Sequence, residues 1–347
     1  MDDIRIRIEG RAGRITLTRP QALNALSHPM CLAVEQALDG WRSDPEVALV
    51  LIDAEGPRAF CAGGDIADIW RAGQRGDYEH ARRFWSDEYR MNLALHRYPK
   101  PVVSLMQGFV MGGGVGIGCH GSHRVLGESA QVAMPECGIG LIPDVGGTFL
   151  LARAPGALGA YLGLTGARMG PADAILTGFA DHHVPEADWP GLVRALVTTG
   201  DPATIPAAAT APPEGRLEGL RPVIDRVFSA ANLGAILDAL AVDGGTFAQG
   251  TRAVLAKNSP LSMACTLAMI RALGPEADLA AALAGEYRFT FRAQEKADFQ
   301  EGIRAAIIDK DRTPHWRHAG AADVAEAEVQ ELLAPLGDRE WTGEQQR

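Results

Sequence analysis

The sequence is short of lysine and of long apolar segments. Only 4 of its 347 residues are lysine, and 43 acidic residues against 33 basic ones give a formal net charge of −10. A negative chain disfavours nonspecific binding to nucleic acid and to anionic membrane surfaces. No apolar run approaches the roughly 20 residues that span a bilayer. We therefore expect neither a nucleic-acid partner nor a membrane partner.

Patterned cysteines are also missing. The five cysteines form no CxxC pair and no even framework, so we predict reduced thiols and no disulfides. The first ten residues, MDDIRIRIEG, contain two acids and lack the apolar stretch of a secretory signal. Together these features indicate a cytoplasmic protein. The hydrophobic content of 47% with 22% charged residues is typical of a globular chain.

Short apolar runs alternate with helical patterns over the first 150 residues, which favours the α/β class. We predict a hairpin from residues 4–8 and 14–18, a helix over 28–41, and strands over 47–53 and 102–110.

The composition changes at residues 198–215, which read TTGDPATIPAAATAPPEG. A stretch so rich in proline, alanine and threonine predicts a linker. We therefore expect a core over residues 1–197, a linker-like segment over 198–215 and a helical region over 216–347. Within the last region, helices are predicted at 263–273, 279–296 and 321–333.

Two glycine-rich turns each follow an apolar strand: CAGGD at 61–65 and MGGGVG at 111–116. Glycine lets the backbone approach a ligand closely, and N–H groups at a helix start point outward. Two such amides converging on one point would form an oxyanion hole, which stabilises an acyl oxygen as it becomes negative. The spacing alone fits two tight strand–helix turns equally well.

Residues 116–121 (GIGCHG) match the GxGxxG pattern of dinucleotide-binding proteins. That motif should open directly from a strand and precede an acid by about 20 residues. Here three glycines intervene first, and the acid nearest that spacing, Glu136, lies in a turn-like MPE. No nucleotide cofactor is therefore expected. His120 and His123 lack a third ligand of clear spacing, so no metal site is expected either.

The segment MPECGIGLIPDVGG (134–147) places Glu136 and Asp144 among apolar residues and glycines. Burying an ionised carboxylate is costly, so such residues usually have a shifted pKa or a chemical role. For Asp144 the alternative is structural, because aspartate stabilises turns of the PDVGG kind.

Five segments resemble the enoyl-CoA hydratase/isomerase (crotonase) family in order and spacing: PQALNALS (20–27), AFCAGGDI (59–66), GFVMGGGVGI (108–117), MPECGIGLIPDVGGT (134–148) and LTGARMGPADAILTGFADHHV (164–184). Three more are similar to its 3-hydroxyisobutyryl-CoA hydrolase branch: GGGVGIGCHGSHRV (112–125), GEYR (285–288) and DFQEGIRAAIIDKDRTPHW (298–316). The resemblance spans about residues 5–318. It implies a spiral core of ββα units followed by helices, assembled as trimers or hexamers.

The chemistry implied by this resemblance is hydrolysis of the 3-hydroxyisobutyryl-CoA thioester in valine degradation, with no cofactor beyond the CoA of the substrate. Gly64 and Gly113 match the two amides that hold the thioester oxygen. Glu136 matches the reacting carboxylate, either as general base on water or as nucleophile forming a mixed anhydride. Asp144 matches its acidic partner.

The resemblance also implies a substrate site and a CoA site. Glu88, in SDEYRMNLAL, matches a glutamate that contacts substrate together with Gly113, Glu136 and Asp144. The alternative for Glu88 is an ordinary solvated helix position. CoA contacts are implied at Ala62 and at Lys310, whose ammonium suits the phosphates.

Enoyl-CoA hydratases of the family generally use two glutamates, and the first of them falls at Gly116. Glycine performs no acid–base chemistry, so hydration is disfavoured. Two alternatives stay open: double-bond isomerisation by Glu136 alone, and a non-catalytic acyl-CoA-binding protein.

Overall fold

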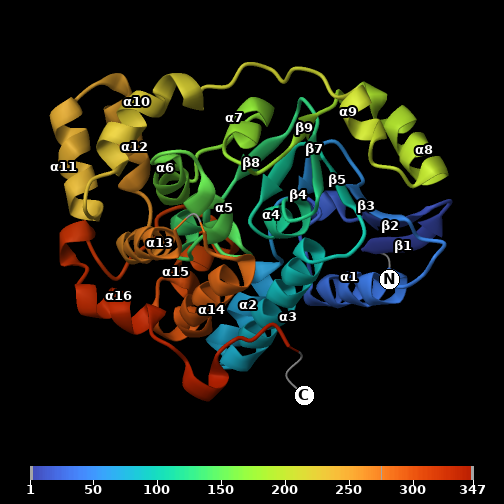
Figure 1. Ribbon diagram of the computed structural model, residues 1–347. Helices are drawn as coiled ribbons and strands as arrows, with labels where there is room; N and C mark the ends of the chain where they lie inside the picture. The colour runs from blue at the N-terminus through green and yellow to red at the C-terminus, as the bar shows by residue number, and fades with distance from the viewer. Residues whose placement is uncertain (1–2, 275, 345–347) are drawn as a thin grey trace. The chain divides into compact units, whose positions relative to one another are not determined.

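The computed structural model describes residues 3–274 and 276–344 (Figure 1). They form two compact units, and each draws on three separate stretches of chain. The sheet unit comprises Met1–Asp65, Asp87–Ala133 and Arg168–Arg216, and the helical unit comprises Ile66–Ser86, Met134–Ala167 and Leu217–Arg347. This interleaved division differs from the three consecutive regions expected from composition.

Two sheets form the sheet unit. The larger has the order β1-β2-β3-β5-β7-β9, and the smaller has the order β4-β6-β8. The first two strands pair antiparallel as the predicted hairpin, and the other pairings are parallel. The strands are β1 (Ile4–Glu9), β2 (Ala12–Leu17), β3 (Leu49–Ala54), β4 (Ala59–Cys61), β5 (Val102–Met106), β6 (Phe109–Met111), β7 (His123–Leu126), β8 (Gln131–Ala133) and β9 (His182–His183).

The strand order displays the repeat of the fold. Consecutive pairs β3/β4, β5/β6 and β7/β8 each give one strand to the larger sheet and one to the smaller, in the same order. The single strand predicted over 102–110 is therefore wrong, since the chain changes sheet within it. The break falls at Gln107 and Gly108: Gly108 has φ +55°, and Gln107 donates its side-chain amide to the carbonyls of Ala54 and Gly56.

Helices α1 (His28–Trp41), α4 (Gly113–Gly118), α7 (Pro171–Leu176), α8 (Trp189–Thr199) and α9 (Thr204–Ala208) belong to the sheet unit, as does the second half of α3 (Tyr78–His96). The predicted helix over 28–41 is confirmed. The segment expected as a linker over 198–215 instead contains the end of α8 and all of α9. Ile205 of α9 is fully buried, so this segment is part of the core.

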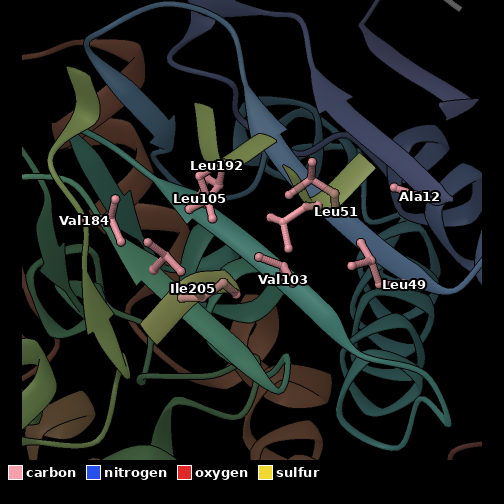
Figure 2. Packing of buried hydrophobic residues seen from close by; sticks show 10 residues of the cluster. Ala12, Leu49, Leu51, Val103, Leu105, Val184, Leu192 and Ile205 are labelled. Carbon is pink, nitrogen blue, oxygen red and sulfur yellow. The ribbon is translucent and has the colours of Figure 1, made fainter. Parts of the chain in front are cut away.

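One apolar core lies between the larger sheet and helices α8 and α9 (Figure 2). Leu49 and Leu51 of β3 are two residues apart, as are Val103 and Leu105 of β5, so each pair faces the same side of the sheet. Against them pack Leu192, Leu196 and Ile205. Burial of each such side chain stabilises the fold by about 1.5–3 kcal/mol.

The helical unit contains α2 (Ile66–Gln74), the 3₁₀ helix η2 (Glu136–Ile139), α5 (Gly147–Arg153), α6 (Leu158–Thr165), α10 (Leu217–Phe228), α11 (Leu233–Asp243), α12 (Thr246–Leu255), α13 (Pro260–Leu273), α14 (Leu279–Lys296), α15 (Phe299–Ile303) and α16 (Glu326–Leu333). The helix predicted over 279–296 is confirmed as α14. The one predicted over 263–273 begins three residues earlier, at Pro260. The helix predicted over 321–333 is too long, because the backbone is extended at Val324 and α16 begins only at Glu326.

Within the described ranges, no single helix is long and apolar enough to cross a membrane. Helices α12 and α13 reach that length and composition only together, and they are bent by 111° at their junction.

Candidate functional site

The two glycine-rich turns meet in the sheet unit. Strand β4 leads to Gly63 with φ +119°, and β6 leads to Gly112 with φ +50°, conformations that glycine adopts readily. A Cβ added to Gly113 would lie 3.2 Å from the nitrogen of Gly64, so the two backbones are in contact. No residue that the structure describes supplies an acceptor to either the Gly64 or the Gly113 N–H. These neighbouring donors can bind one oxygen that carries negative charge.

Glu88 lies beside these turns. It sits on α3 and is 2% exposed, and a Cβ at Gly113 would be 2.8 Å from its Oε1. The solvated interpretation of Glu88 is therefore wrong. Burial, with a further contribution from the charge of Glu88, raises the pKa of Cys61 to about 12. The Cys61 thiol thus stays protonated at neutral pH and packs rather than acting as a nucleophile.

Helix α4 carries Gly116, the position at which a hydratase of the family would have its first glutamate. Gly116 is buried and supplies no side chain. Ala62, the implied CoA contact in the first turn, donates its N–H to the carbonyl of Leu23 at 3.0 Å.

Glu136 is the first residue of η2 in the helical unit and is only 5% exposed. Its Oε2 has no hydrogen-bond partner among the described residues. Burial raises the pKa of Glu136 well above its usual value, and the charges of Asp144 and Glu286 raise it further. A carboxyl in this setting is a proton acceptor of increased basicity.

Asp144 is likewise 5% exposed, and it opens a turn with an unusual backbone. Val145 (φ +52°) and Gly146 (φ +80°) both lie in the left-handed region, and the Gly147 N–H donates to the Asp144 carbonyl at 2.7 Å. A β-branched residue such as Val145 rarely adopts this conformation, which marks local strain. The charge of Asp144 raises the pKa of Glu136, so the two predicted acids, both buried, interact electrostatically.

Sequence reasoning assigned no role to the third acid of this cluster, Glu286. This α14 residue is fully buried and accepts hydrogen bonds from the Gly146 N–H at 2.8 Å, the Thr148 N–H at 3.0 Å and the Thr148 hydroxyl. Burial raises the pKa of Glu286 to about 8, with Asp144 adding to the shift and the donated bonds opposing it. The sequence feature that could have predicted the burial of Glu286 is its position three residues after Leu283, on the buried side of α14.

Lys310, the implied phosphate contact, is exposed and follows the π-helical segment Arg304–Ile308 with φ +58°. The two neighbours of Lys310 in the sequence, Asp309 and Asp311, both pair with Arg304. Over the part of the chain that is described, no group of three His, Cys, Asp or Glu residues could hold a metal ion.

A family model described as enoyl-CoA hydratase/isomerase matches residues 12–333 of this sequence. The chain belongs to the enoyl-CoA hydratase/isomerase family. The resemblance found in its motifs is thereby confirmed, as is the crotonase-type α/β fold with a helical C-terminal region.

Several relatives in this family match nearly the full chain. The mitochondrial 3-hydroxyisobutyryl-CoA hydrolase of Gallus gallus is 36% identical, with 97% of this chain and 90% of the relative covered. That of Danio rerio is 39% identical, covering 95% and 89%. 3-Hydroxyisobutyryl-CoA hydrolase 1 of Arabidopsis thaliana is 37% identical, covering 92% and 88%.

Two solved structures of the family superpose on the chain with a TM-score of 0.94. An enoyl-CoA hydratase from Rhodobacter sphaeroides 2.4.1 is 56% identical and covers 98% of this chain and 99% of its own. A carnitinyl-CoA dehydratase from Mycobacterium thermoresistibile is 42% identical and covers 99% and 100%. The relatives therefore share one fold but carry the names of different acyl-CoA reactions, and the residues of this chain must discriminate between them.

Proposed function

We propose that this protein hydrolyses the thioester of 3-hydroxyisobutyryl-CoA to 3-hydroxyisobutyrate and CoA, a step of valine degradation. The relatives named 3-hydroxyisobutyryl-CoA hydrolase, 36–39% identical over nearly the full chain, support the substrate. One observation carries the choice of hydrolysis over hydration: Gly116 offers no acid, whereas Glu136 and Asp144 form a buried acidic pair.

In this reaction the Gly64 and Gly113 N–H groups donate to the carbonyl oxygen of the thioester. Their donation strengthens as the carbonyl carbon is attacked and the oxygen becomes negative. Removal of one such donor typically costs about 2.7–4 kcal/mol of transition-state stabilisation. The two donors are neutral backbone amides, and the turns hold them in position before the oxygen becomes negative.

Glu136 acts on the carbonyl carbon in one of two ways. As a general base it takes a proton from water while the water oxygen bonds to the carbon, and the carbon–sulfur bond then breaks to release the CoA thiolate, which is protonated. As a nucleophile it forms a mixed anhydride with release of the thiolate, and water then hydrolyses the anhydride. Both routes require ionised Glu136, so its raised pKa makes the rate increase with pH.

The remaining residues orient the substrate. Asp144 aligns the attacking water or the substrate 3-hydroxyl, and Glu88 lies close enough to Gly113 to contact the acyl group. Ala62 and Lys310 are proposed to contact CoA, with Lys310 pairing with its phosphates.

The experiment mixes purified protein with 3-hydroxyisobutyryl-CoA and, separately, with enoyl-CoA, and follows free thiol and the enoyl absorbance. Thiol release from the first substrate that is lost in Glu136→Gln supports the hydrolase. Absence of thiol release from 3-hydroxyacyl-CoA esters contradicts it.

The name of the Rhodobacter sphaeroides structure makes enoyl-CoA hydration or isomerisation the second candidate. Loss of enoyl absorbance without thiol release would favour a hydratase, and a shifted double bond without hydration would favour an isomerase. Binding of acyl-CoA with no turnover would identify a non-catalytic acyl-CoA-binding protein.

A further inference from the structure

We propose that Glu286 is a positioning residue: it holds the left-handed turn at residues 144–148 and so fixes the position of Asp144. The inference rests on the proposed thioester hydrolysis, because it assigns Glu286 a part in aligning the two acids of that reaction.

The contacts of Glu286 are concentrated on this one turn. Oε2 accepts the N–H of Gly146, which precedes α5, and Oε1 accepts both the N–H and the hydroxyl of Thr148 in the first turn of that helix. Both carboxylate oxygens are therefore used, and all three donors come from within four residues of Asp144. Glu286 reaches this turn from α14, 138–140 residues further along the chain.

The turn requires stabilising contacts from other residues because its backbone is strained. Val145 directly follows Asp144, adopts φ +52° and is 1% exposed. A valine persists in the left-handed region only when its surroundings over-determine that conformation. The bonds from Gly146 and Thr148 to Glu286 fix the chain immediately after Val145. Without them the turn can relax and move Asp144.

The identity of residue 286 follows from the number of acceptors that the turn requires. A third buried carboxyl beside Glu136 and Asp144 is electrostatically unfavourable, and a neutral residue would avoid that cost. Glutamine has the same size but presents only one acceptor oxygen, so its NH₂ group would face one of the donating N–H groups. A carboxyl presents one oxygen to the Gly146 N–H and the other to the Thr148 N–H, as the structure shows.

The test measures kcat and KM for thiol release from 3-hydroxyisobutyryl-CoA. Glu286→Gln is expected to lower kcat roughly 10- to 100-fold with KM within about twofold, since a misplacement of about 1 Å costs on the order of 10²-fold in rate. Thr148→Val removes only the hydroxyl donor and should lower kcat severalfold. Glu286→Asp keeps two acceptor oxygens and should retain more kcat than Glu286→Gln.

Tyr287→Phe is the matched control. Tyr287 is the next residue of α14, is 2% exposed, and its hydroxyl donates to the Arg82 carbonyl at 3.3 Å rather than to the turn. Its loss should lower the melting temperature and leave kcat unchanged. Hydrogen exchange at the Gly146 and Thr148 amides should accelerate in Glu286→Gln but not in Tyr287→Phe.

A Glu286→Gln variant with the kcat of Tyr287→Phe, or with a raised KM and normal kcat, overturns the positioning role. If Glu286→Gln does not fold, Thr148→Val decides, and its wild-type kcat would overturn the role. Absence of thiol release from the wild-type protein would instead reject the hydrolase itself, and the exchange experiment would then test the hold on the turn by itself.

Discussion

The sheet unit and the helical unit supply functional groups of opposite physical character. At Gly64 and Gly113 the sheet unit offers neutral backbone amides in turns that glycine permits without strain. At Glu136, Asp144 and Glu286 the helical unit buries three carboxyls, and the pKa of Glu136 and of Glu286 rises because burial disfavours their charge. The glycine turns should therefore be sensitive to shape, whereas the acidic cluster should be sensitive to charge and pH.

The largest effect is expected from Glu136→Gln, which removes charge and keeps shape. Thiol release should fall by roughly 10³–10⁴-fold in kcat, because a positioned acid–base group or nucleophile is lost. The free energy of unfolding at pH 7 should not fall, since a buried carboxyl with one unpartnered oxygen is replaced by a neutral group. Steady-state kinetics and urea denaturation measure the two quantities. Equal losses of activity and stability would assign Glu136 a structural role.

Gly113→Ala tests shape in the sheet unit. Its Cβ would lie 2.8 Å from Glu88 Oε1 and 3.2 Å from the Gly64 nitrogen, where the thioester oxygen is proposed to bind. We expect kcat to fall about 10²–10³-fold, as for the loss of one oxyanion donor, because the added methyl group would keep the thioester oxygen from the two N–H groups. Gly40→Ala is the control, because a Cβ there meets nothing within 4 Å and alanine favours the helix. Wild-type kcat in Gly113→Ala would remove this turn from the proposed mechanism.

Local patterns in the sequence predicted several helices and the glycine turns of the sheet unit. The helices over 28–41 and 279–296 follow from periodicity, and the glycine turns follow from composition, because glycine readily adopts the positive φ found at Gly63 and Gly112. The family motifs added the residues Glu136 and Asp144, both of which the structure buries.

The features that the sequence analysis did not predict have a common physical cause: each forms through contacts with residues distant in the sequence. Strands β5 and β6 form one apolar run along the chain and separate only because they pair in different sheets. Helix α9 forms in a proline- and alanine-rich stretch because Ile205 packs on strands from the start of the chain. The donors to Glu286 lie about 140 residues before it, so no local pattern specifies them.

The acidic cluster should also make stability depend on pH. The pKa of Glu286 is about 8 in the folded protein and about 4.3 when unfolded, so between these values the folded state holds an extra proton. Stability therefore falls as pH rises, by about 1.4 kcal/mol per pH unit for each such group. Glu136 adds to the same trend, since its pKa is raised as well.

Urea denaturation from pH 5 to 8 measures this slope, and the difference between wild type and Glu286→Gln isolates the contribution of this one carboxyl. The slope should be shallower in the variant by about 1.4 kcal/mol per pH unit. Parallel curves would show that Glu286 is ionised throughout and would contradict the raised pKa.

The smallest effect is expected from removing a helix cap, which should lower stability without changing activity. Asn232 caps α11 in the helical unit, where its side chain accepts the Ala235 N–H at 2.9 Å. Asn232→Ala should lower the free energy of unfolding by about 1 kcal/mol, the usual cost of losing an N-cap. It should leave kcat, KM and the pH slope of stability at wild-type values, because it changes neither a carboxyl of the cluster nor the 144–148 turn. A kcat loss comparable to that of Glu286→Gln would mean that activity follows the general stability of the helical unit. It would contradict a specific effect of Glu136, Asp144 and Glu286 on activity.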